Sequence, residues 1–132
     1  EGAVLLAGGP GRPEGLDTGF YIRPTLFEVD PAMRVNQEEI FGPVLCIMPF
    51  DTEEQAIALA NDSVYGLGAY VQTLDIEKAQ RVARQLRAGN VSINGAAYDY
   101  DVPFGGTKQS GNGRENGVYG LHDFLDIKAI AD

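Results

Sequence analysis

The sequence has 132 residues, enough for one domain with a single core, of which 44% are hydrophobic, and its net charge is −9 at pH 7. That acidic balance repels phosphate backbones and anionic lipid surfaces, and no apolar run approaches the roughly 20 residues that a membrane-spanning helix requires, so neither nucleic acid nor a membrane is an expected partner. The lack of such a run predicts a soluble protein. A single cysteine cannot form an internal disulfide, which fits a reducing compartment, and the cytoplasm is the expected location.

The chain opens on an apolar run, residues 3–7, which is typical of a buried strand and ends at a glycine-rich segment. Because the sequence begins with Glu1 rather than Met, and this run follows almost at once, we expect a piece of a longer protein. The segment up to Thr18 is predicted to be a surface loop, since the G-x-G-x-x-G spacing of a phosphate-binding loop is absent. Residues 19–29 are aromatic and β-branched but interrupted by Pro24, which predicts an edge strand or a bent pair.

The middle of the chain alternates strand and helix. One helix begins at the capping pattern Thr52-x-x-Gln55, and a second begins at Asp75 and is expected to end at Gly89 as its C′ residue. The apolar run after Pro43 is continuous, as in a strand buried on both faces. The order strand, helix, strand, helix, strand predicts an α/β fold with a parallel sheet and right-handed crossovers. The predicted ranges are 44–50, 53–61, 69–72, 76–88 and 91–94.

Residues 94–117 form a long glycine-rich segment that contains the rings of Tyr98, Tyr100 and Phe104. Segments of this length without regular structure are usually functional or disordered, and the aromatic content argues against disorder. After it, residues 118–124 are predicted to form one or two helical turns. The alternation over 125–129 predicts a half-buried strand, which needs a partner from another chain or another segment.

Four motifs occur in a fixed order. They read EEIFGPV (residues 38–44), NDSVYGLG (61–68), PFGG (103–106) and KQSGNGRE (108–115). Together they resemble the aldehyde dehydrogenase superfamily over almost the whole chain. The resemblance implies that residues 1–123 are the C-terminal part of the Rossmann-like, parallel-sheet catalytic domain, and that residues 124–132 are a terminal strand through which a homo-oligomer, dimer or tetramer, forms.

The resemblance also implies what the parent protein does. Members of this superfamily use NAD or NADP to oxidise an aldehyde to a carboxylic acid through a cysteine thiohemiacetal and a thioester. The nucleophilic cysteine and the water-activating glutamate belong to motifs upstream of this sequence, so we expect no catalytic residue in the chain and no activity from it alone. Two alternatives stay open: a non-catalytic assembly or binding subunit of the same fold, and an acylating or acyl-phosphate-reducing relative.

Four residues are candidates for binding. Taken alone, Glu39 is an ordinary solvated carboxylate, although a carboxylate can accept hydrogen bonds from both hydroxyls of a ribose. The resemblance assigns Glu39 to the nicotinamide ribose and Phe41 to a place near the nicotinamide. It assigns Phe104 to the substrate tunnel and places Tyr98 near a second tunnel aromatic; such walls suit an apolar or aromatic aldehyde.

Three other residues have side chains that could act in catalysis or metal binding, but the sequence argues against each of these roles. Cys46 lies in an apolar run and is predicted to pack as a small hydrophobe rather than to act as a nucleophile. Glu38 is not assigned as a general base, because the base of the superfamily lies upstream. His122 is the only histidine and has no neighbouring ligands at suitable spacing, so no metal site is expected.

Overall fold

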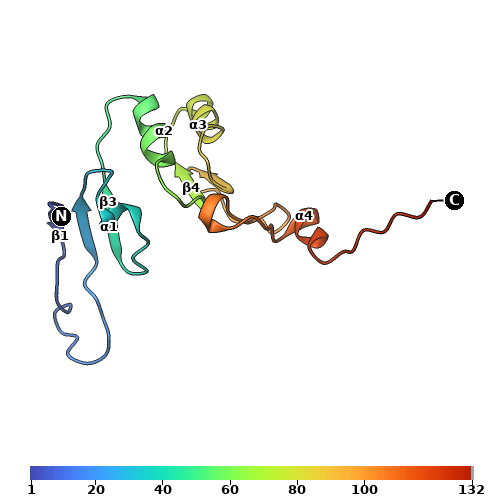
Figure 1. Ribbon diagram of the computed structural model, residues 1–132. Helices are drawn as coiled ribbons and strands as arrows, with labels where there is room; N and C mark the ends of the chain where they lie inside the picture. The colour runs from blue at the N-terminus through green and yellow to red at the C-terminus, as the bar shows by residue number, and fades with distance from the viewer. Residues whose placement is uncertain (132) are drawn as a thin grey trace. The chain divides into compact units, whose positions relative to one another are not determined.

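The computed structural model describes residues 1–131, which divide into two compact units, residues 1–59 and the residues from 60 onward (Figure 1). Each unit contains its own sheet with parallel strand pairing, and helices alternate with strands along the chain. The predicted α/β class is confirmed. No helix of residues 1–131 combines the length and the apolar character needed to cross a membrane.

The first unit is built on a three-stranded sheet in the order β1 (Val4–Ala7), β2 (Thr25–Glu28), β3 (Val44–Ile47). β2 pairs antiparallel with β1 and parallel with β3. The predicted edge strand or bent pair is wrong, because β2 is the middle strand and begins only after Pro24. Proline has no N–H to donate, so the ladder starts at the next residue, where the Thr25 N–H donates to the carbonyl of Pro43 (2.9 Å).

Both outer strands of this sheet are more open than the sequence predicts. β1 is exposed along its length, and β3 alternates half-buried and exposed positions instead of being buried on both faces. Leu45 is 62% exposed, because no segment of the first unit covers that face of the sheet. A continuous apolar run shows that a strand can be buried on both faces, but only packing elements can bury it.

The helices of the first unit begin where local chemistry predicts. α1 (Arg34–Gln37) is a single turn before the EEIFGPV motif, and α2 (Glu53–Asn61) has the predicted bounds. The N–H of Gln55 donates to the Thr52 hydroxyl (3.2 Å), and the Gln55 side-chain oxygen accepts from the Asp51 N–H (2.7 Å). These two hydrogen bonds resemble a capping box, in which the side chain three residues after the N-cap accepts from the N-cap N–H. Here Gln55 accepts instead from the N–H of Asp51, the residue before Thr52.

The second unit contains a strand–helix–strand unit: β4 (Gly68–Val71), α3 (Ile76–Ala83) and β5 (Asn90–Ile93). β4 and β5 are parallel, and α3 packs against both strands. Asp75 caps α3 by accepting from the Lys78 N–H (2.9 Å), as predicted, and Ala79 on its inner face is fully buried. The sequence predicted that β3, β4 and β5 would lie in one parallel sheet. Only β4 and β5 do so, because β3 belongs to the sheet of the first unit.

Gly89 has a different role from the predicted helix stop. α3 ends at Ala83 with Arg84 as its cap, and Gly89 does not have a positive φ. Its N–H donates to the carbonyl of Gly66 (3.0 Å), and a Cβ built on it would overlap the carbonyl oxygen of Gly105. Gly89 is therefore required because another backbone passes against it, not because of a left-handed conformation.

The remaining segment is mostly irregular, as predicted. It contains the short 3-10 helix η1 (Lys108–Ser110), the helix α4 (Gly117–His122) and an isolated bridge between Phe104 and Glu115. Residues 125–131 form no strand within this chain, and Asp132 lies outside the described residues. The terminal oligomerisation strand over 124–132 stays a prediction, because an edge pairing requires a second chain.

We expect Gly89→Ala to destabilise the full-length protein that contains this chain by roughly 1–3 kcal/mol, because the new methyl group must displace the Gly105 backbone. Gly68→Ala is the matched control, since a Cβ at Gly68 meets no atom within 4 Å and its φ is not positive. Thermal melting of both variants measures the difference. An equal melting temperature for the two variants would contradict the close approach.

Candidate functional site

The first candidate site is the loop that connects α1 to β3. Gly42 and Pro43 form its tight end, where the Val44 N–H donates to the carbonyl of Gly42 (2.8 Å) in a three-residue turn. Phe41, just before this turn, has a φ of 52°, an uncommon conformation for a residue with a bulky side chain. The loop therefore holds an aromatic residue in a strained backbone conformation.

The two adjacent glutamates of this loop have different surroundings. Glu38 accepts from Arg34 one helical turn earlier (2.9 Å), and the hydrogen bond and charge of Glu38 raise the pKa of Arg34. Glu39 has no hydrogen-bond or ion-pair partner among the described residues. The structure thus pairs one carboxylate and leaves its neighbour available to a ligand.

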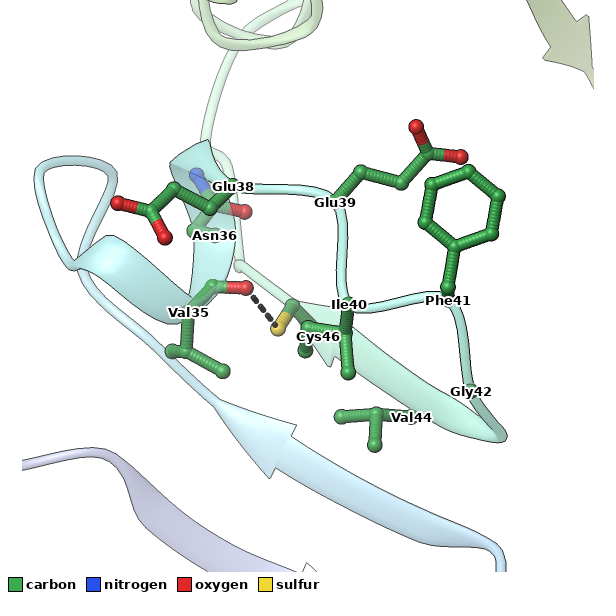
Figure 2. Close-up of a pocket in the computed structure, with 9 residues that line it drawn as sticks. All are labelled: Val35, Asn36, Glu38, Glu39, Ile40, Phe41, Gly42, Val44 and Cys46. Carbon is green, nitrogen blue, oxygen red and sulfur yellow. Dashed lines mark hydrogen bonds between the residues drawn. The ribbon is translucent and has the colours of Figure 1, made fainter.

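Figure 2 shows how these side chains lie. Glu39 and Phe41 project away from the strand, whereas Cys46 points toward α1. Phe41 is 90% exposed, so its ring face is open to an incoming group. A hollow of about 330 Å³ lies between α1 and the start of β3. Its wall includes Asn36, Glu39, Ile40, Phe41 and Cys46.

Cys46 behaves as the sequence predicts for a packed thiol. It is half-buried, and its Sγ donates to the carbonyl oxygen of Val35 (3.5 Å), the interaction drawn as a dashed line in Figure 2. Burial raises the pKa of the Cys46 thiol, because the apolar surroundings disfavour the thiolate. A raised pKa is the opposite of what activates a cysteine nucleophile.

The second candidate site lies in the second unit, against β4 and β5. Tyr98 makes edge-to-face contacts with Tyr100 (ring centroids 4.8 Å apart) and with Phe104 (5.9 Å). Both residues predicted for the substrate tunnel therefore lie in one aromatic cluster. The cluster borders a cavity of about 540 Å³, whose wall includes Tyr70, Asn90, Ser92, Tyr98, Asp99 and Phe104.

Two asparagines that the sequence analysis did not single out hold this cluster. Asn90 makes hydrogen bonds to the backbone on both sides of Phe104, and the Asn116 side chain donates to the Tyr98 hydroxyl. Asn116 has a φ of 63°, in the left-handed region where asparagine is among the better tolerated residues. The only sequence signal for Asn90 is its position, because a polar amide at the start of a strand that also carries Val91 and Ile93 needs a hydrogen-bond partner.

The cations of the last motif hold backbone carbonyls. Lys108 Nζ donates to the carbonyls of Asn61 (3.1 Å) and Ser63 (2.8 Å) and so satisfies the C-terminal end of α2. Arg114 donates to the carbonyls of Gly106 (2.7 Å) and Gly113 (2.8 Å). These contacts give both cations a structural role, because each holds backbone carbonyls in place.

His122 is the last residue of α4, and its ring lies against that of Tyr119 (centroids 6.4 Å apart). Over residues 1–131, no three His, Cys, Asp or Glu side chains gather in a way that could hold a metal ion.

A sequence profile of the aldehyde dehydrogenase family matches residues 1–130. The chain therefore belongs to the aldehyde dehydrogenase family, and the predicted membership is confirmed. It is 57% identical over 131 residues to a 3-succinoylsemialdehyde-pyridine dehydrogenase of a Pseudomonas species, with 98% of this chain and 28% of that protein covered. The chain thus spans little more than a quarter of the length of this curated relative.

Solved structures agree with the fold. Aldehyde dehydrogenase C of Pseudomonas syringae, a mutant complexed with NAD+ and octanal, superposes with a TM-score of 0.94 at 55% identity, covering 98% of this chain and 27% of that one. An aldehyde dehydrogenase of Mycobacterium tuberculosis complexed with NAD+ gives a TM-score of 0.89 at 58% identity, covering 93% and 26%.

We expect Cys46 to react with a disulfide reagent such as DTNB at least several-fold more slowly than a free thiol at neutral pH. Burial limits access to the sulfur and raises the pKa of the thiol, so the rate should climb at a higher pH than that of a free thiol. The chain has one cysteine, so the absorbance of the released thiolate reports this residue alone. The same chain in urea is the control. A folded rate equal to the urea rate would contradict the packed thiol.

Proposed function

We propose that the full-length protein containing this chain is an NAD(P)-dependent aldehyde dehydrogenase that converts an aldehyde to a carboxylic acid. In this proposal the first unit contributes Glu39 and Phe41 to the nicotinamide half of the cofactor, and the second unit contributes Phe104 and Tyr98 to the aldehyde pocket. The observation that carries it is the unpartnered carboxylate of Glu39 beside the exposed, strained Phe41, in a chain that belongs to the aldehyde dehydrogenase family.

The chemistry of the first site fits a nicotinamide nucleoside. A carboxylate accepts two hydrogen bonds at once, which matches the vicinal hydroxyls of a ribose, and an open phenyl face packs against a flat heteroaromatic ring. The hollow of about 330 Å³ beside these groups leaves room for such a ligand. NAD+ is present in the structures of the Pseudomonas syringae and Mycobacterium tuberculosis relatives, which supports the same cofactor here.

The chemistry of these groups indicates a separate role for the cofactor and for each residue near it. When bound, the cofactor supplies the electron acceptor for the oxidation. Glu39 orients the cofactor by holding its ribose, and Phe41 restricts the plane in which the nicotinamide can lie. Covalent catalysis through a thiohemiacetal and a thioester is assigned to a cysteine outside this sequence, because Cys46 is packed and its pKa is raised.

The second site supports an uncharged, apolar or aromatic aldehyde as substrate. The rings of Tyr98 and Phe104 offer apolar area rather than charge, and Asp99 in the same cavity wall repels a carboxylated substrate. The names of two relatives agree with this class, since one acts on a pyridine-bearing semialdehyde and another is complexed with octanal.

The full-length protein tests the proposal. We expect NADH or NADPH absorbance at 340 nm to rise when an aldehyde is added, with a higher kcat/KM for benzaldehyde and octanal than for the anionic aldehyde glyoxylate. Formation of the acid in equal amount, followed by chromatography, confirms that the aldehyde is oxidised. A protein that binds neither nucleotide and oxidises none of these aldehydes would overturn the proposal.

A charge-neutralising pair of variants tests the cofactor site. We expect Glu39→Gln to raise the KM for the cofactor by roughly 10- to 100-fold, because it removes hydrogen bonds to a charged acceptor worth about 1.5–3 kcal/mol. Glu38→Gln is the matched control, since it removes the adjacent charge but only an exposed ion pair, and the KM should change less than about twofold. Equal effects of the two variants, measured by steady-state kinetics, would contradict the assignment.

A further inference from the structure

The backbone of Phe104 is held from two sides. On one side, Asn90 Nδ2 donates to the carbonyl of Pro103 (3.0 Å), and the Gly105 N–H donates to Asn90 Oδ1 (3.2 Å). On the other side, the Phe104 N–H donates to the Glu115 carbonyl (2.8 Å), and the Glu115 N–H donates back to the Phe104 carbonyl (2.7 Å). The side-chain amide of Asn90 thus binds the backbone directly before and directly after Phe104, the residue whose ring borders the aromatic cavity.

This pair of hydrogen bonds depends on the chemistry of the asparagine side chain. Its amide offers a donor and an acceptor at the same short reach, so it can replace a strand partner for the peptide groups on either side of Phe104. Aspartate lacks the donor and glutamine is one methylene longer. The close approach of Gly105 to Gly89 brings this backbone within reach of Asn90, which is the next residue along the chain from Gly89.

We propose that Asn90 is a positioning residue for aldehyde selectivity. Its two hydrogen bonds fix the backbone at Phe104, and the edge-to-face contact of Phe104 with Tyr98 transmits that position to the wall of the aldehyde cavity. Asn90 acts through Phe104 rather than by reacting with the substrate. This inference rests on the proposed function, because it assumes that the cavity beside Phe104 receives the aldehyde.

The same strand provides a matched control. Asn94 follows the other end of β5 and makes two similar hydrogen bonds with the backbone of Thr73, accepting from its N–H and donating to its carbonyl (2.9 Å each). Asn94 is not part of the cavity wall. If the asparagines served only to stabilise the sheet, their removal would have the same consequences.

The experiment uses the full-length protein with the cofactor that supports its activity, and compares kcat/KM for benzaldehyde and acetaldehyde. We expect Asn90→Ala to lower the benzaldehyde to acetaldehyde ratio by about tenfold, mainly through the KM for benzaldehyde, because the larger ring depends on the aromatic wall. Asn94→Ala should lower the melting temperature at least as much, because Asn94 also has a positive φ (51°) that alanine tolerates less well, and should leave the ratio unchanged. Equal ratios in the two variants would overturn the inference.

A double-mutant cycle decides whether Asn90 acts through Phe104. Phe104→Ala should lower the same ratio, and adding Asn90→Ala to it should then have no further effect, since the ring to be positioned is gone. Independent, multiplying effects of the two substitutions on the ratio would overturn the inference. Asn90→Asp is the second variant if Asn90→Ala does not fold: it keeps the acceptor for Gly105 but faces the Pro103 carbonyl with a carboxylate that cannot donate, so it should also lower the ratio.

The outcomes also separate this inference from the proposed function. A wild-type protein that oxidises no aldehyde overturns the proposed function, and the selectivity role with it. A wild-type protein that oxidises both aldehydes, while Asn90→Ala leaves their ratio unchanged, overturns only the role of Asn90.

Discussion

The second unit depends on the close passage of three backbone segments at glycines. A Cβ on Gly66 would meet the Arg87 carbonyl and the Thr107 hydroxyl, and one on Gly89 would overlap the Gly105 carbonyl. Because these positions carry no side chain, the Gly66 carbonyl can accept from the N–H groups of both Gly89 and Thr107 (3.0 and 2.9 Å). That junction brings the irregular segment after β5 against the βαβ unit, and so places Phe104 beside Asn90.

The two candidate sites differ in exposure and in how firmly their side chains are held. The loop at Glu39 and Phe41 is open, with a free carboxylate and an exposed ring on a strained backbone. The aromatic cavity has a wall fixed by hydrogen bonds on both sides of Phe104 and by the bond from Asn116 to Tyr98. In the proposed function, the open loop suits a cofactor that binds and leaves, whereas the fixed wall suits discrimination between substrates by shape.

Burial explains why some predictions from the sequence were wrong. Among the described apolar residues, only Val29 and Ala79 are buried, although the runs that became β1 and β3 have the composition of interior strands. Exposed apolar faces of this kind mark surfaces that bind further protein. The chain spans 28% of the length of its Pseudomonas relative, so in such a protein the remaining residues are available to cover them.

The sequence by itself determined the features that neighbouring residues control: the caps of α2 and α3, the order of helices and strands, and the four family motifs. Their physics acts within one or two helical turns, where the sequence can be read directly. Tertiary structure alone decided that β2 is central, that Gly89 makes room for Gly105, and that Asn90 holds Phe104. These are contacts between residues distant in sequence, and local patterns do not specify which backbone will pass beside another.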